Sequence, residues 1–196
     1  MDAASFLDRI LEKMSSSHDI VRDYPAERLL PQGGRGTEEP GGCLSQDVFP
    51  AYAFYASTSE KYVLTKKASL WTICEYEHVL FLTGEKESGA EPQPEYAQRL
   101  IAGYMEPVLV RKGKKYPPRN HMRSFLTVVL LLDGSPGKEL IRKIRKYRFD
   151  KGYLFSVRGY AQGRLVAVDL SAGKVYTSPA ARDVADFYET VLRSAV

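Results

Sequence analysis

Apolar residues recur at helical spacing in four segments of the chain, and this spacing predicts four amphipathic helices. The second helix runs from about Glu95 to Glu106. The third and fourth each follow a Ser-Pro pair, at Ser135 and Ser178, which is typical of an N-cap and a first helical residue. The four apolar stripes are Phe6, Leu7, Ile10, Leu11 and Met14; Ala97, Leu100, Ile101, Tyr104 and Met105; Leu140, Ile141, Ile144 and Tyr147; and Val184, Phe187, Tyr188, Val191 and Leu192.

Segments rich in aromatic and β-branched residues lie between the helices and predict strands. Residues 124–132 are almost continuously apolar, which indicates a central strand buried on both faces. With the third helix and a strand at residues 153–157, this strand predicts a β-α-β unit whose two strands are parallel. The other predicted strands are 51–57 and 61–65 around a turn at 58–60, 70–74 and 79–82 around a turn near 75–77, and 164–170 and 174–177 around a turn at 171–173.

The order of these elements, α-βββ(β)-α-β-α-ββ-α, predicts an α+β fold. We expect a single mixed sheet, an antiparallel meander plus one β-α-β unit, with helices packed on it. Residues 31–46 contain five glycines and two prolines and predict a flexible loop. Both sides of this loop look structured, but the N-terminal helix is too short to form a domain. We therefore expect one domain over residues 1–196.

Composition places this domain among globular proteins. The chain is 44% hydrophobic and 11% aromatic, which argues against global disorder. It has two cysteines, Cys43 and Cys74, without metal-ligand spacing, and its first residues show no signal peptide. The longest apolar run is far shorter than the ~20 residues that span a bilayer. These features predict a cytoplasmic protein without a membrane partner.

Charge is distributed unevenly along the chain. Residues 111–151 contain 13 basic and 3 acidic side chains, a net charge of +10, whereas the whole chain carries +4. Such a segment can bind phosphate backbones through release of counterions; the alternative is a solvated helix face plus a soluble loop, since charged patches are common and unspecific. The predicted contact residues are Arg111, Lys112, Lys114, Lys115, Arg119, Arg123, Arg142, Lys143, Arg145 and Lys146.

Acidic residues on the meander suggest a second hypothesis. A helix, a meander, a helix and a strand is also the core order of restriction-endonuclease-like folds, in which carboxylates and a lysine hold a divalent ion. Here Glu75 and Glu77 would be the ligands, with Lys66 or Lys67 near the phosphate. The Pro-Asp and Asp/Glu-x-Lys elements of those enzymes are missing, so edge charges at a turn are the simpler interpretation.

Two weaker patterns lead to no assignment. His78, Glu77 and His121 could meet around a metal, but they lack ligand spacing. Residues 134–138 lie between a strand and a helix, where a phosphate could bind, yet they do not match a P-loop and indicate an ordinary capped turn. We therefore predict no metal and no cofactor.

Several stretches resemble a small bacterial family of uncharacterised proteins that share a domain of unknown function. The resemblance implies one domain over most of the chain outside the glycine-rich loop, and it brings no activity and no catalytic residue. The stretches are 17–25, 60–67, 120–132, 153–170 and 174–177.

The sequence thus favours a non-catalytic domain that binds a macromolecular partner, either a polyanion such as nucleic acid or a polypeptide, through its basic segment. The alternative is a divalent-metal-dependent, nuclease-like phosphodiesterase that uses Glu75, Glu77 and Lys66.

Overall fold

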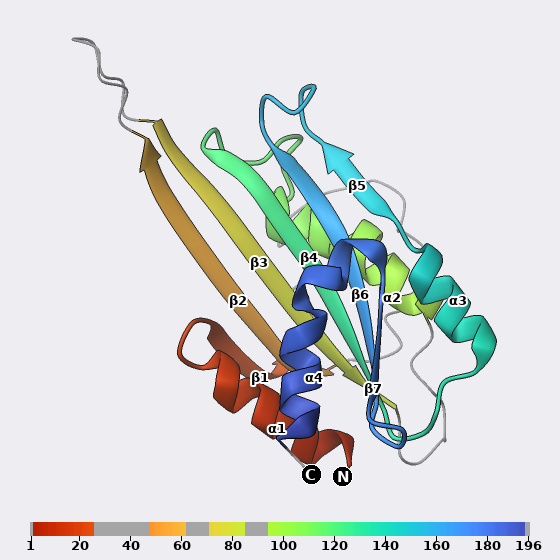
Figure 1. The fold of residues 1–196 in the computed structure, drawn as a ribbon. Coiled ribbons are helices and arrows are strands. Elements are labelled where there is room, and N and C mark those ends of the chain that lie inside the picture. The colour runs from red at the N-terminus through yellow and green to blue at the C-terminus, as the bar shows by residue number, and fades with distance from the viewer. Residues whose placement is uncertain (1, 26–47, 62–70, 85–93, 195–196) are drawn as a thin grey trace.

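The computed structural model describes residues 2–25, 48–61, 71–84 and 94–194 (Figure 1). Within these ranges one seven-stranded sheet has the order β1-β2-β3-β4-β6-β5, and β7 also pairs with β6. The strands are β1 (Asp19–Pro25), β2 (Val48–Lys61), β3 (Trp71–Thr83), β4 (His121–Leu132), β5 (Phe149–Gly152), β6 (Tyr160–Asp169) and β7 (Lys174–Thr177).

The sheet is mixed. Strands β1, β2 and β3 form an antiparallel meander, whereas β3, β4 and β6 are parallel to one another. On the far edge of β6, β5 pairs antiparallel with residues 160–163 and β7 with residues 166–169. The predicted α+β class with one mixed sheet is therefore confirmed.

Helices cover the two faces of the sheet. The front face carries α1 (Ala3–Met14), the 3-10 helix η3 (Pro179–Val184) and α4 (Ala185–Arg193), and the back face carries α2 (Pro94–Leu100), the π-helix η2 (Ile101–Val110) and α3 (Lys138–Lys146). Figure 1 shows α1 and α4 in front of one end of the sheet. The other end of β2 and β3 extends beyond both helices.

The central strand joins two hydrophobic cores. Along β4, Leu126, Val128 and Leu130 pack toward α2 and η2, while Val129 and Leu131 pack toward α1 and α4. A strand buried on both faces must be apolar at nearly every position. The predicted central strand at 124–132 is therefore confirmed, and the apolar stripes of all four predicted helices contribute buried residues to these cores.

The predicted turns inside the meander are wrong. Residues 58–60 continue β2, where Thr58 pairs with Cys74 and Ser59 with Ile73, and residues 75–77 continue β3. Thr58 and Ser59 are exposed to solvent, whereas Glu75 and Glu77 are partly buried beside Arg123 and Arg164. The sequence pattern therefore resembles a turn although the backbone stays extended.

The structure differs from the predicted β-α-β unit in the position of the second strand. Strand β5 ends at Gly152, and residues 153–159 form turns rather than strand. The parallel partner of β4 is β6, and β5 is antiparallel to β6. Helix α3 also begins later than predicted, with Gly137 as its N-cap, while the predicted N-cap Ser178 does precede η3.

Two elements were not predicted from the sequence. Residues 19–25 form the edge strand β1, and the second helix continues beyond Glu106 as a π-helix to Val110. The glycine-rich loop at 31–46 lies outside the described residues. Among the helices in the described ranges, none combines the length and apolar character needed to cross a membrane.

Candidate functional site

The ten predicted contact residues lie in three places. One group is on α3, a second is in the turn that follows η2, and Arg123 lies on the front face of β4, where it pairs with Glu75. Lys143 on α3 pairs with Glu95 in the first turn of α2, whereas Arg111 follows the last residue of η2. The first two groups therefore lie at opposite ends of a helix roughly 25 Å long.

Helix α3 is strongly amphipathic. Ile144 is buried in the core of the back face, and Tyr147 directly after the helix packs beside it. The four predicted cations occupy the other side, where Arg142, Arg145 and Lys146 are exposed. Because apolar and basic residues alternate at helical spacing, packing the apolar stripe on the sheet turns the basic residues outward.

A hollow of about 520 Å³ lies against this helix, and its lining is mostly cationic. No aspartate or glutamate contributes to the lining. Two carboxylates flank the hollow instead: Lys143 contacts Glu95 at 2.5 Å and Glu139 at 3.4 Å. The lining residues are Gln98, Arg142, Lys143, Lys146, Tyr147 and Arg148.

Two of these cations are available to a ligand. Within the described part of the chain, Lys146 and Arg148 form no ion pair with a carboxylate, whereas Lys143 is paired and Arg142 lies 3.9 Å from Glu139. The hydrogen bond to Glu95 raises the pKa of Lys143, so this side chain stays protonated. The hollow thus keeps its positive charge across the neutral pH range.

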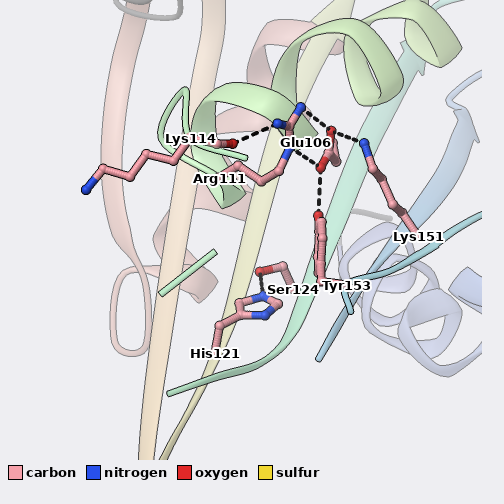
Figure 2. A network of polar contacts seen from close by, with 7 residues as sticks. All are labelled: Glu106, Arg111, Lys114, His121, Ser124, Lys151 and Tyr153. Carbon is pink, nitrogen blue, oxygen red and sulfur yellow. Dashed lines mark hydrogen bonds and ion pairs between the residues drawn. The ribbon is translucent and has the colours of Figure 1, made fainter. Parts of the chain in front are cut away.

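The basic turn after η2 is organised differently, around a buried carboxylate (Figure 2). Glu106 is only 1% exposed, and Arg111 donates to it from Nε at 2.7 Å and from Nη2 at 3.2 Å. Lys151 Nζ and the Tyr153 hydroxyl also donate to it, at 2.9 and 2.8 Å. We call these four residues the Glu106 network.

The Glu106 network holds its carboxylate in the charged form. Burial by itself raises the pKa of Glu106, but the hydrogen bonds from Arg111, Lys151 and Tyr153 outweigh it and lower the pKa below the ordinary value. Conversely, burial and the bond to Glu106 raise the pKa of Tyr153. Arg111 and Lys151 therefore stabilise the fold, and Arg111 is less free to bind a partner than its position in the basic segment suggested.

The π-helix positions this carboxylate. The amide of Arg111 donates to the carbonyl of Glu106, five residues earlier, at 3.2 Å. A π-helical turn widens the helix by one residue, and such turns are frequent at functional or strained positions. The wide turn lets Glu106 point to the sheet while Arg111 folds back onto it, as Figure 2 shows. No spacing in the sequence indicated this arrangement.

A β-bulge brings a serine and a histidine together next to the network. Cys74 pairs with His121, but Glu75 pairs with Arg123, so β4 has one extra residue at this point. Because the bulge shifts the alternation of the strand, His121 and Ser124 lie on the same face although they are three residues apart. The bulge could not be recognised from the sequence.

The hydrogen bonds of His121 define its tautomer. Its Nδ1 lies 2.9 Å from the Arg158 carbonyl, which can only accept, so Nδ1 carries the proton. Burial lowers the pKa of His121 and favours the neutral ring, so Nε2 accepts from the Ser124 hydroxyl at 2.8 Å. A hydrogen bond from a serine hydroxyl to a neutral imidazole also joins the nucleophile and the general base of many enzymes. However, Ser124 is 0% exposed and does not line the hollow that His121 borders, so we interpret the pair as structural.

His78 occupies the same face. Its Nδ1 lies 2.7 Å from the Tyr52 hydroxyl. Burial, with smaller contributions from His121 and Lys112, lowers the pKa of His78 to about 3. Glu77 lies on the opposite face of β3, so the metal site of His78, Glu77 and His121 considered from the sequence is wrong.

The carboxylates of the nuclease hypothesis have arginine partners. Glu75 contacts Arg123 at 2.7 Å, and Glu77 lies 3.5 Å from Arg164, whose guanidinium covers the ring of Phe125 at 3.4 Å. Burial raises the pKa of Glu77, and the nearby Arg164 opposes that rise. Within the described ranges no cluster of three or more His, Cys, Asp or Glu residues could hold a metal ion.

The third member of that hypothesis, Lys66, lies outside the described residues, as do Lys67 and the rest of the segment that joins β2 to β3. The nuclease-like activity thus stays a prediction from the sequence. Glu75 and Glu77 do share one sheet face, as the hypothesis requires, but each has an arginine partner, and Arg164 also pairs with Asp183 at 2.8 Å beside Glu77.

These features define an α+β protein with one mixed sheet and two separate cationic regions. The chain belongs to the family described as a domain of unknown function, DUF8052, whose family model matches residues 2–190. The family resemblance seen in the sequence is thereby confirmed, while the bacterial origin stays a prediction. No curated protein and no solved structure matches the chain.

Proposed function

We propose that this protein is a non-catalytic binding domain whose α3 hollow holds a phosphate-rich polyanion. One observation carries the proposal: four cationic side chains, Arg142, Lys143, Lys146 and Arg148, line a single hollow that no carboxylate lines. Gln98 adds an amide that can donate to phosphate oxygens. Nucleic acid is the probe that presents such phosphates at regular spacing.

Binding at this hollow would follow the charge of the partner rather than its base sequence. Lysine and arginine contact phosphate oxygens, and the displaced counterions make affinity depend on salt. The hollow has one aromatic lining residue, Tyr147, and its side chain is buried in the core rather than open to a stacked base. We therefore expect the affinity for nucleic acid to vary little with base sequence and to depend strongly on salt concentration.

The experiment measures fluorescence anisotropy of a labelled oligonucleotide titrated with the protein at about 50 and about 200 mM salt. We expect the affinity to fall with salt, with a slope of log K against log salt between about −2 and −4 for two to four phosphate contacts. Affinity that is the same at both salt concentrations would contradict the proposal.

A pair of charge-reversed variants locates the contact. Arg142→Glu with Lys146→Glu places two carboxylates at the hollow, and we expect about a hundredfold weaker binding at low salt. The matched control is Lys13→Glu with Arg182→Glu, which makes the same charge change on the front-face helices. Equal losses in both double variants would mean that net charge, and not this hollow, governs binding.

A further inference from the structure

A tight loop between β5 and β6 holds apolar side chains out in solvent. Leu154, Phe155 and Ser156 have φ angles of 48°, 52° and 66°, which is the left-handed region that residues other than glycine rarely adopt. Phe155 is fully exposed, at 104%, and Val157 is 80% exposed. A loop that keeps three successive residues in an unfavourable conformation while it exposes a phenyl ring suggests a function for that ring.

Hydrogen bonds fix the loop to itself. The amides of Val157 and Arg158 donate to the carbonyls of Leu154 and Tyr153 at 3.0 and 3.1 Å, and the Gly159 amide donates to Ser156 at 3.0 Å. These bonds close one left-handed turn. The backbone that carries the exposed ring of Phe155 therefore has a defined conformation.

The same loop is attached to the body of the protein. Arg158 Nη1 donates to the Pro117 carbonyl at 3.3 Å, and its own carbonyl accepts from His121. Gly159 has a φ of +74° and lies so close to β4 that a Cβ would approach the Met122 carbonyl oxygen to 2.1 Å. Met122 itself is 44% exposed. We call Met122, Leu154, Phe155 and Val157 the apolar tip.

The apolar tip lies beside the basic turn that follows η2. Neither residues 107–132 nor residues 151–168 contain an aspartate or a glutamate. Within the described part of the chain the basic side chains of this end form no ion pair with a carboxylate, apart from Arg111, Arg123, Lys151 and Arg164. The unpaired cations are Lys112, Lys114, Lys115, Arg119 and Arg158.

We propose that this end of the molecule binds the surface of an anionic lipid bilayer. The apolar tip would enter the boundary between headgroups and acyl chains, and the surrounding lysines and arginines would contact anionic headgroups. Arg119 lines a hollow of about 410 Å³ next to Met122 and Val157, where a headgroup phosphate would fit. This differs from the sequence-based expectation of no membrane partner, and it is independent of the α3 hollow.

A lipid surface fits this tip better than a protein or a nucleic acid does. The tip is convex, since Phe155 protrudes fully, and a deformable apolar layer accepts a protruding ring without a preformed pocket. Leu154, Val157 and Met122 offer aliphatic surface, which gains little from stacking on bases. The cations around the tip complement the negative potential of anionic headgroups.

Vesicle sedimentation tests the proposal with the full chain. The probes are vesicles of phosphatidylcholine alone and of phosphatidylcholine with phosphatidylglycerol. We expect the protein to sediment with the anionic vesicles, to remain largely in solution with the neutral ones, and to dissociate as salt is raised. No sedimentation with anionic vesicles at low salt would overturn the proposal.

Two double variants separate insertion from charge. Phe155→Ser with Val157→Ser removes the apolar contact, and Lys114→Glu with Lys115→Glu reverses two charges of the turn; we expect each to weaken vesicle binding about tenfold or more. Val48→Ser, which changes a side chain that is 49% exposed at the opposite end of the sheet, should bind as the unchanged protein does. Unchanged binding of the Phe155 and Val157 variant would exclude the apolar tip as the contact.

Fluorescence reports insertion directly. Trp71 is the single tryptophan of the chain, so Trp71→Phe with Phe155→Trp places the only indole at the tip. We expect its emission to shift to shorter wavelength with anionic vesicles, and an unshifted emission would overturn insertion. Self-association that Phe155→Ser abolishes, in the absence of vesicle binding, would instead identify the tip as a contact between copies of this chain.

The two proposals fail independently. Arg142→Glu with Lys146→Glu should lose oligonucleotide binding but keep vesicle binding, and Lys114→Glu with Lys115→Glu should do the reverse. If both double variants lose both activities to the same degree, the tip has no specific part in vesicle binding and the lipid proposal is wrong.

Discussion

The two cationic regions are both rich in lysine and arginine, but individual cations within them differ in their distance from a carboxylate. At the end of η2, Arg111 donates to the buried carboxylate of Glu106, whereas Lys146 on α3 has no carboxylate partner in the described residues and lines an open hollow. A cation that satisfies a buried charge stabilises the fold, and a cation without such a partner is available to a ligand. The comparison shows that the position of the nearest carboxylate, not the density of lysine and arginine, decides the role of each cation.

Removing the buried carboxylate is the strongest test of this difference. Glu106→Gln removes the negative charge that Arg111 and Lys151 share and replaces one acceptor oxygen with an NH2 group that also donates, and we expect the free energy of unfolding to fall by about 3–5 kcal/mol at neutral pH. Chemical denaturation measures this change. The control is Glu139→Gln on α3, where the carboxylate is exposed and the loss should stay within about 0.5 kcal/mol.

The pH dependence of that loss has a defined sign. Because the pKa of Glu106 is lower in the folded protein than in the unfolded chain, its contribution is complete above the unfolded pKa and disappears as the pH falls through the folded pKa. The difference between the unchanged protein and Glu106→Gln should therefore shrink below about pH 4.5. A difference that stays constant into the acid range would mean that Glu106 is not charged in the fold.

Replacing the arginine of the Glu106 network should have the next largest effect on the free energy of unfolding. Arg111→Met keeps much of the aliphatic stem but removes two hydrogen bonds to Glu106, which retains Lys151 and Tyr153. We expect a loss of about 2 kcal/mol in the free energy of unfolding. A loss near zero would place Arg111 with the available cations and remove the contrast between the two regions.

The buried histidines next to the Glu106 network predict a further pH dependence of the free energy of unfolding. The pKa of His78 is about 3 in the fold and about 6.5 in the unfolded chain, so the unfolded chain binds more protons between these values. The contribution of neutral His78 to the free energy of unfolding should therefore be fully present above about pH 6.5. Below that pH, His78 alone should lower the free energy of unfolding by about 1.4 kcal/mol per pH unit. His121, whose pKa is also lowered, adds to this slope.

The variant His78→Gln isolates this contribution. Glutamine does not titrate, so the free energy of unfolding measured at pH 6 and pH 5 should change less with pH than in the unchanged protein, by up to about 1.4 kcal/mol over this interval. Identical pH dependence in both proteins would show that His78 is accessible to protons in the fold.

The α3 cations should affect stability least. Lys146→Met changes an exposed side chain without a carboxylate partner in the described residues, and we expect the free energy of unfolding to change by no more than about 0.5 kcal/mol. The same variant should lower the slope of oligonucleotide binding against salt by about one. If Lys146→Met destabilises the protein as much as Arg111→Met, these two cations contribute equally to the stability of the fold.

Much of the fold was predictable because long periodic segments determine their own element type. The four apolar stripes identified the helices, and residues 124–132 identified the central strand, since burial on both faces requires apolar residues throughout. The errors occurred where polar residues lie in extended structure, at 58–60 and 75–77. At Thr58 and Ser59 the polarity reflects exposure to solvent, and at Glu75 and Glu77 it reflects pairing with arginines of β4 and β6; neither marks a change in backbone direction.

The candidate sites were less predictable, and for a different reason. Arg111 and Lys146 both lie in basic stretches of the sequence, but Arg111 donates to the buried Glu106 at a π-helical turn, whereas Lys146 is exposed on α3. The pairing of His121 with Ser124 depends on a bulge, which is set by the register between β3 and β4. The apolar tip was interpreted as strand because Leu154, Phe155 and Val157 have strand-forming side chains.

The sequence alone determined the class of the fold, the helix faces, the central strand and the amount of positive charge, because each depends on periodicity or composition within one segment. Tertiary structure alone decided which cations are neutralised, which histidines are buried and which apolar residues remain in solvent. These outcomes depend on groups that are distant along the chain, such as Glu106 with Lys151 and Gly159 with Met122. Local patterns contain no information about such contacts, since packing of the sheet and helices brings the groups together.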